Sequence, residues 1–176
     1  IASTSTSCTN EATGTKCQSK LILWDAASYS PIADLPSNVA RLWDISFSPD
    51  SKSLAAGGEN GVVIWDISSE NFTMKLIDQT EVQIGQPLVG HSSIITSLKF
   101  SPDGKKLVSG GCNFNAITKI ELCDKGEVML WSVENSSPII SSIFFKNSQS
   151  VYEIATSPSG DQLLVNDHGN IIIWDV

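Results

Sequence analysis

Basic residues are scarce in this chain of 176 residues. Lysine and arginine together number 11 against 19 aspartates and glutamates, which leaves a net charge of −8 at neutral pH. Because nucleic acids are bound through clusters of basic side chains, this balance argues against a nucleic-acid partner. No apolar run approaches the roughly 18 residues that a membrane-spanning helix needs, and no signal peptide is visible from Ile1 onward. We therefore expect no membrane partner and favour the cytoplasm.

Groups that carry catalysis are also sparse. The two histidines, His91 and His168, fall in different parts of the chain, and no Gly-x-Ser-x-Gly, zinc-type histidine motif or phosphate-binding glycine loop is present. A catalytic nucleophile needs a base held beside it, and the sequence offers no such pair. We therefore predict no catalytic residue, no metal site and no cofactor.

Short β-type runs that end in tight turns are abundant. In the stretch 90–132, residues 94–100 are rich in β-branched and apolar side chains, and Ser-Pro-Asp-Gly follows at 101–104. Proline, aspartate and glycine each favour a turn there. A later run at 127–133 carries Trp131. This order predicts an antiparallel meander, and no comparable window shows helical spacing.

The same pattern recurs along the chain. Tryptophan closes a β-type run at Trp24, Trp65, Trp131 and Trp174. The middle spacing of 66 residues exceeds its neighbours of 41 and 43, because that repeat carries two inserted loops. A period of about forty with Gly-His, Ser-Pro-Asp-Gly and a closing Trp-Asp resembles the WD-repeat β-propeller family over essentially the whole chain.

The resemblance implies an all-β fold, a partial WD-repeat β-propeller of about four antiparallel blades. We treat residues 1–176 as one propeller segment with units at approximately 1–35 (partial), 36–84, 85–140 and 141–176 (partial). Because the first unit begins at its second strand and the last stops at its third, we expect an open arc cut from a longer array, with intramolecular contacts to missing flanking repeats. Trp43 also precedes an aspartate, but its closeness to the next turn places it on an inner strand.

In family members, a histidine, a serine or threonine, an aspartate and the closing tryptophan of one blade share buried hydrogen bonds. Here His91, Ser109 and Trp131 supply three of these groups, and the inserted loop displaces the fourth, with Asp124 or Lys125 nearby. We therefore expect no unit to be complete. The residues aligned with Ser109 in the other units are Ser5, Ala56 and about Leu164.

Four cysteines form two pairs, Cys8 with Cys17 and Cys112 with Cys123, and each pair brackets a loop between the second and third strands of a unit. Zinc prefers four ligands at tight spacing, whereas each loop offers only two thiols. Buried free thiols and the disulfides Cys8–Cys17 and Cys112–Cys123 both stay open. A disulfide that closes about ten residues would contribute roughly 2–3 kcal/mol.

Family members dock partners on one face of the propeller, which here corresponds to residues 9–16, 36–43, 90–96, 112–126 and 146–152. When the inner strands are aligned on their turns, an arginine and two large aromatic residues gather near the channel mouth. That composition is typical of a recognition hot spot. The predicted partner-binding residues are Arg41, Ile94 and Ser150 at one position, and Trp43, Thr96 and Tyr152 two residues later.

We therefore predict a non-enzymatic protein-interaction scaffold or sensor that binds another protein or a peptide. Trp43 and Tyr152 could instead pack between blades. A resemblance to bacterial WD-repeat arrays leaves open a regulatory array of a larger signalling ATPase, kinase or caspase-like peptidase. An enzymatic propeller and a purely structural array are the remaining alternatives.

Overall fold

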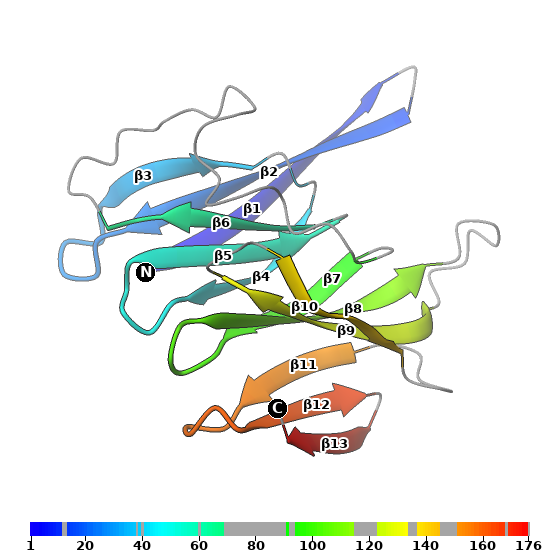
Figure 1. The fold of residues 1–176 in the computed structure, drawn as a ribbon. Helices are drawn as coiled ribbons and strands as arrows, with labels where there is room; N and C mark the ends of the chain where they lie inside the picture. The colour runs from blue at the N-terminus through cyan, green and yellow to red at the C-terminus, as the bar shows by residue number, and fades with distance from the viewer. Residues whose placement is uncertain are drawn as a thin grey trace.

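The computed structural model describes residues 1–11, 14–37, 39, 41–59, 61–68, 91, 94–114, 123–133, 137–144, 151–167 and 169–175. Over these residues the chain forms thirteen strands in four antiparallel sheets (Figure 1). The prediction of an all-β chain with about four antiparallel blades in an open arc is confirmed. Among the described residues, no helix has the length and apolar character needed to cross a membrane.

Each sheet is a meander in which strands that follow one another in the sequence are hydrogen-bonded neighbours. The first sheet contains β1 (Ala2–Glu11), β2 (Gly14–Trp24) and β3 (Pro31–Pro36). The second contains β4 (Leu42–Phe47), β5 (Ser53–Gly58) and β6 (Gly61–Asp66). The third contains β7 (Ile94–Phe100), β8 (Lys106–Phe114), β9 (Cys123–Ser132) and β10 (Ser137–Phe144). The fourth contains β11 (Val151–Thr156), β12 (Gln162–Asp167) and β13 (Asn170–Asp175).

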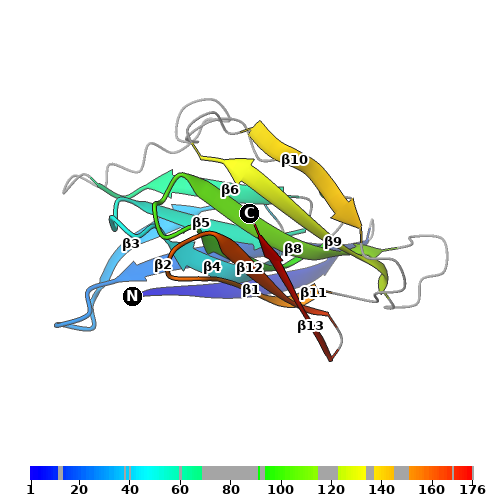
Figure 2. The ribbon, with the colours of Figure 1, turned by 60° about the horizontal axis from the view of Figure 1, so that its bottom comes forward.

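The four sheets follow one another in a stack, with β1–β3 at one end and β11–β13 at the other (Figure 1). The inner strands of the last three sheets are in direct contact, β4 with β7 and β7 with β11. The outermost strand of the third sheet, β10, lies at the upper margin of the molecule in Figure 2. The row of inner strands therefore forms one continuous rim of the arc.

The hydrophobic core is divided into three clusters, one in each seam between neighbouring sheets. Leu54 of β5 packs in the seam with the first sheet, and the next residue, Ala55, packs in the seam with the third. Ile154 and Val165 fill the seam between the third and fourth sheets. Side chains of a strand point alternately to its two faces, so a strand that is covered on both faces reads as a continuous apolar run.

The seam between the second and third sheets depends on a glycine. A Cβ atom added to Gly57 of β5 would lie 2.6 Å from Ile95 Cγ2 and 2.7 Å from Leu98 Cδ2. Both of these β7 side chains are fully buried. The absence of a side chain at Gly57 is therefore what lets β7 approach the second sheet this closely.

The turn between the first two strands is built in the same way in successive sheets. In the third sheet, the Ser101 hydroxyl donates to Asp103 Oδ1 (2.5 Å) and accepts the Lys106 N–H (2.9 Å). The turn residue Gly104 has a φ of 72°, and in the second sheet Ser51 adopts a φ of 60° at the same position. The Ser101 hydroxyl and the Lys105 N–H hold the pKa of Asp103 below its ordinary value.

Candidate interaction surface

Each inner strand of the last three sheets carries a β-bulge at the same place. The register of β4 with β5 skips Trp43, that of β7 with β8 skips Thr96, and that of β11 with β12 skips Tyr152. A bulge inserts one residue without a cross-strand partner and changes the direction of its side chain. Trp43, Thr96 and Tyr152, here called the bulge row, are therefore equivalent positions of three neighbouring strands.

Hydrogen bonds across the seams hold β4 and β7 side by side next to the bulge row. Asp44, which follows Trp43, accepts the Leu98 N–H at Oδ2 (2.9 Å) and the Ser97 hydroxyl at the same oxygen (3.3 Å). A carboxylate that accepts from a backbone N–H forms a charge-assisted bond, which is stronger than a neutral one. These two bonds fix the position of Trp43 relative to Thr96.

A second set of bonds does the same between β7 and β11. Ser97 accepts the Ile154 N–H (3.2 Å), and the Thr96 hydroxyl donates to the Val151 carbonyl. Val151 directly precedes Tyr152, so the bond from Thr96 ties two adjacent members of the bulge row. The row is therefore held by the packed seams and not by loops.

The two aromatic members of the bulge row are exposed. Trp43 is 56% exposed and Tyr152 is 54% exposed, whereas Thr96 between them is half-buried. Large aromatic side chains exposed to this degree next to ordered backbone are typical of recognition sites. The alternative that these two aromatic residues pack between blades does not agree with their exposure.

The other predicted binding residues take different places. Arg41 precedes β4 and is exposed, with its Nη1 atom 3.4 Å from Glu59 Oε1. Ile94 begins β7, is half-buried and forms a β-bridge with Glu59. Ser150 lies outside the described residues. Arg41 and Ile94, each two residues before a member of the bulge row, are thus joined through Glu59.

Three of the predicted network residues form a buried chain of hydrogen bonds, with a fourth partner that the sequence did not predict. Trp131 Nε1 donates to Ser109 Oγ (2.7 Å), and Ser109 Oγ lies 2.6 Å from His91 Nε2. His91 Nδ1 lies 3.2 Å from Oε2 of Glu127. We expected the inserted loop to displace the carboxylate of this network, with Asp124 or Lys125 nearby, and to leave the unit incomplete. That expectation is wrong, because Glu127 on β9 supplies the carboxylate. The third sheet therefore has a complete network.

This network has the order of atoms found in a Ser-His-acid catalytic triad, but it is closed to substrates. The Trp131 N–H, the Ser109 hydroxyl and the ring N–H of His91 each have an acceptor if Ser109 donates to His91 Nε2 and His91 Nδ1–H donates to Glu127. Ser109 is 0% exposed, and its oxygen already accepts the Trp131 N–H. A nucleophile must reach the carbonyl that it attacks, so the arrangement stabilises the third sheet.

The first sheet repeats the tryptophan–serine bond in an exposed setting. Trp24 Nε1 donates to Ser3 Oγ (2.9 Å), and Ile1 lies opposite Trp24. In the third sheet Leu107 lies opposite Trp131 and Ser109 is two residues further. The residue equivalent to Ser109 is therefore Ser3, and the alignment of Ser5 was wrong by two residues. By the same register it is Ala56 in the second sheet and Val165, one residue after Leu164, in the fourth.

The cysteine pairs differ in what the structure describes. Cys8 of β1 and Cys17 of β2 lie directly opposite each other and form a disulfide. Cys112 pairs with Gly126 in the backbone register, whereas Cys123 pairs with Phe114. The side chains of Cys112 and Cys123 lie outside the described residues, so their disulfide stays a prediction. Among the described residues, no three His, Cys, Asp or Glu side chains gather in a group that could hold a metal ion.

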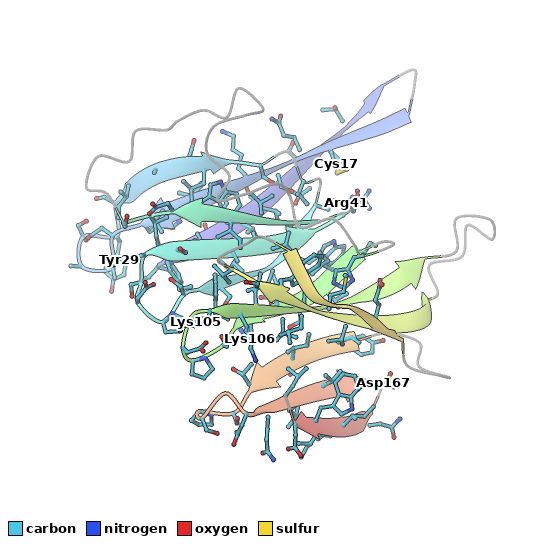
Figure 3. The ribbon with its side chains drawn as sticks, viewed as in Figure 1. Cys17, Tyr29, Arg41, Lys105, Lys106 and Asp167 are labelled. Atoms are coloured by element: carbon cyan, nitrogen blue, oxygen red, sulfur yellow. A yellow bond between two sulfur atoms is a disulfide. The ribbon has the colours of Figure 1, made fainter. Side chains whose placement is uncertain are left out.

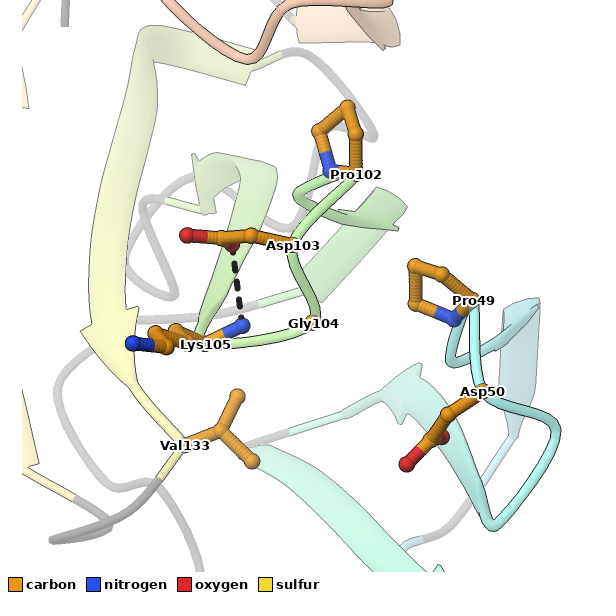
Figure 4. A pocket seen from close by; sticks show the side chains of 7 residues that line it. All are labelled: Pro49, Asp50, Pro102, Asp103, Gly104, Lys105 and Val133. Carbon is orange, nitrogen blue, oxygen red and sulfur yellow. Dashed lines mark hydrogen bonds between the residues drawn. The ribbon is translucent and has the colours of Figure 1, made fainter.

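A shallow pocket of about 550 Å³ lies between two of the Ser-Pro-Asp turns (Figure 4). Figure 3 shows Lys105, which lines this pocket, at the opposite end of the sheets from Arg41. Asp50 and Asp103 each use one carboxylate oxygen within their own turn, so we assign no ligand to this pocket. Its lining residues are Pro49, Asp50, Pro102, Asp103, Gly104, Lys105 and Val133.

Two features of the site, Glu127 and the bulges, were not predicted from the sequence. Glu127 shares a strand face with Trp131, because residues four apart in a strand point the same way, and this alternation would have found it. The bulges have no such signal, since an inserted residue such as Trp43 looks like any other residue of a short strand.

Comparison with known proteins agrees with this architecture. The model of the family "WD domain, G-beta repeat" matches residues 29–66 and 82–117. Those segments contain the bulged strands β4 and β7. These two segments of the chain are therefore WD repeats, and the sheets are arranged like blades of a β-propeller.

Several curated WD-repeat proteins are similar over most of the chain. Protein HIR1 of Candida albicans is 27% identical over 79% of the chain, which covers 18% of that protein. The guanine nucleotide-binding protein subunit beta of Schizosaccharomyces pombe is 27% identical over 82% of the chain, covering 39% of the subunit. Human apoptotic protease-activating factor 1 is 26% identical over 85% of the chain, covering 10% of its length. The chain thus spans less than half of each of these relatives.

Proposed function

We propose that the chain is a scaffold that binds a protein or peptide on the rim formed by its inner strands, with Trp43 and Tyr152 as anchors. The observation that carries this proposal is the recurrence of one bulge in three neighbouring strands. Each bulge presents one side chain of the bulge row, and two of the three are exposed aromatics. We propose no catalytic role for this chain.

The rigidity of the rim supports this assignment. Ordering a side chain on binding costs free energy, so anchors that are already fixed bind more tightly than mobile ones. The backbone beside Trp43 and Tyr152 is tied across the seams by Asp44, Ser97 and Thr96. A partner therefore meets two aromatic residues whose backbone positions are set by β4, β7 and β11.

The charge of the chain suggests the chemistry of the partner. The chain carries a net charge of −8, and Glu153 beside Tyr152 is exposed. Cations are attracted to the faces of tryptophan and tyrosine rings. We therefore propose a partner segment that places apolar and basic side chains on the bulge row, and Arg41, Ile94 and Ser150 extend the same surface.

The test is selection of a phage-displayed library of random peptides on the immobilised chain, followed by measurement of Kd for the enriched peptides. Trp43→Ala and Tyr152→Ala should each raise Kd by about five- to thirtyfold, equivalent to roughly 1–2 kcal/mol. Tyr29→Ala is the matched control, because Tyr29 is 76% exposed but lies at the opposite end of the sheets from Arg41, the residue two before Trp43 (Figure 3).

Two results would contradict the proposal. One is the absence of any enriched peptide. The other is binding that Trp43→Ala and Tyr152→Ala leave as tight as Tyr29→Ala does. An equal loss of thermal stability and binding in the two variants would identify the aromatics as packing residues.

A second candidate function is a sensor array within a larger signalling protein. The similarity to apoptotic protease-activating factor 1, over 85% of the chain, favours it. Under this proposal the bulge row binds the signal and an effector domain outside these residues responds. Sequencing of the complete reading frame would test it, since a neighbouring ATPase, kinase or peptidase domain is required.

A further inference from the structure

The disulfide between Cys8 and Cys17 lies within a continuous ladder of cross-strand pairs. Cys8 and Cys17 form one of ten successive residue pairs that join β1 and β2, and the ladder continues past them to Glu11 and Gly14. Cys8 is exposed and Cys17 is half-buried. An exposed disulfide within an already paired ladder is open to attack by thiols in solution.

One sulfur of this disulfide faces a cation from the next sheet. Arg41 is the only arginine of the chain, and its Nε atom lies 3.3 Å from Cys17 Sγ (Figure 3). Arg41 belongs to the segment that leads into β4 and adopts a φ of 49°, which is rare for a residue with a side chain. Glu59 holds the other end of the guanidinium at Nη1.

Arg41 would bind a Cys17 thiolate more strongly than it binds the sulfur of the disulfide. The sulfur of a disulfide is a weak acceptor, whereas a thiolate carries a full negative charge and bonds strongly to a guanidinium. A neighbouring arginine stabilises the thiolate form of a cysteine, and a stabilised thiolate is also the better leaving group in exchange. Cys8 has no such neighbour among the described residues.

We propose that Cys8–Cys17 is a thiol–disulfide exchange site for low-molecular-weight thiols. The incoming thiolate attacks the exposed Cys8 sulfur, the bond between the two cysteine sulfurs breaks, and its electron pair leaves with Cys17 as a thiolate held by Arg41. A second thiol then attacks the mixed disulfide on Cys8, which yields two reduced cysteines and one oxidised thiol dimer. In the reverse direction, the Cys17 thiolate attacks a mixed disulfide on Cys8 and expels the thiol.

The probe is reduced glutathione, added to the oxidised chain under native conditions and followed by trapping of free thiols with iodoacetamide. Trypsin cuts after Lys16 and separates Cys8 from Cys17, and the other two cysteines fall on two further peptides. We expect glutathione on the peptide 1–16 and the alkyl group on the peptide 17–20. Glutathione mainly on 17–20, or no exchange before the chain unfolds, would overturn the proposal.

The role of Arg41 is tested on the fully reduced chain at neutral pH. Arg41→Gln should slow alkylation of Cys17 by about threefold to tenfold, because fewer molecules carry the thiolate, and should leave Cys8 unchanged. Arg41→Lys should restore part of the rate. Lys52→Gln is the matched control, since it removes the same charge from an exposed turn at a distance. An unchanged Cys17 rate in Arg41→Gln would overturn the assignment, and the peptide that glutathione modifies in the wild-type chain decides the question if this variant does not fold.

Discussion

Ser109 offers the sharpest test of the buried network, because its single oxygen joins Trp131 and His91. Ser109→Ala removes both hydrogen bonds and leaves the Trp131 N–H in the core without its acceptor. A lost buried hydrogen bond costs about 0.5–1.5 kcal/mol, and a buried donor left unpaired costs about 1–3 kcal/mol. We therefore expect Ser109→Ala to lower the free energy of unfolding by about 2–4 kcal/mol.

The first sheet supplies the matched control. Ser3→Ala removes the equivalent bond to Trp24, but that bond is exposed and water can replace the serine. We expect this variant to lose less than about 1 kcal/mol. Urea unfolding followed by tryptophan fluorescence gives both values, and midpoints should be compared at equal slope.

Two outcomes would refute the reasoning. If Ser109→Ala lowers the free energy of unfolding no more than Ser3→Ala does, burial does not determine how much the network stabilises the chain. If Ser109→Ala is as stable as the wild type, the geometry around Ser109 relaxes to satisfy Trp131 in another way.

Two further predictions concern the seams and the turns. Gly57→Ala should destabilise the chain by about 1–3 kcal/mol in the same urea assay, since the new Cβ would overlap Ile95 and Leu98, and an unchanged midpoint would mean that β7 moves away without penalty. The pKa values of Asp50, Asp103 and Asp161 are lowered by hydrogen bonds from the hydroxyls of Ser48, Ser101 and Ser159, respectively. Their contribution to stability is therefore full above about pH 4, the ordinary value of an unfolded aspartate, and is lost as the pH falls through the lowered folded values. Urea midpoints measured from pH 7 down to about pH 2 should show this loss, and Asp103→Asn should reduce it. An equal acid loss in that variant would contradict the assignment to the turn carboxylates.

The fold was predictable because its signals are local. β-Branched runs, Ser-Pro-Asp turns and the closing tryptophans act over a few residues, and they placed the strands and put Trp43 on an inner one. The bulge row was predicted by alignment on the turns, although the bulges themselves were not. The pairing of Ser3 with Trp24 depends on the register between two strands, and a slip of two residues keeps the same face toward the core. Composition therefore could not distinguish Ser3 from Ser5.

Glu127 shows a different limit of the sequence. The carboxylate was sought in the loop near Asp124, where family resemblance places it, but burial selects the residue that shares a face with Trp131. A carboxylate in the core is stable only with partners, and His91 provides one at 3.2 Å. Residues 91 and 127 are far apart in the sequence, so their pairing could not be predicted from local patterns.

The bonds that cross the seams also determine how the chain comes apart. Ser97 accepts from Ile154 and donates to the carboxylate of Asp44, so one hydroxyl connects the second, third and fourth sheets. Between the first and second sheets, the Ser19 hydroxyl accepts the Leu42 N–H and the Cys17 sulfur accepts from Arg41, but the strand contact is mainly that of β1 with β4, whereas β11 lies against β7, β8 and β9. Local unfolding proceeds in cooperative units that break where the fewest interactions cross. The last three sheets then open together as one unit, while the hairpin of β1 and β2 with β3 can separate first and leave the bulge row intact.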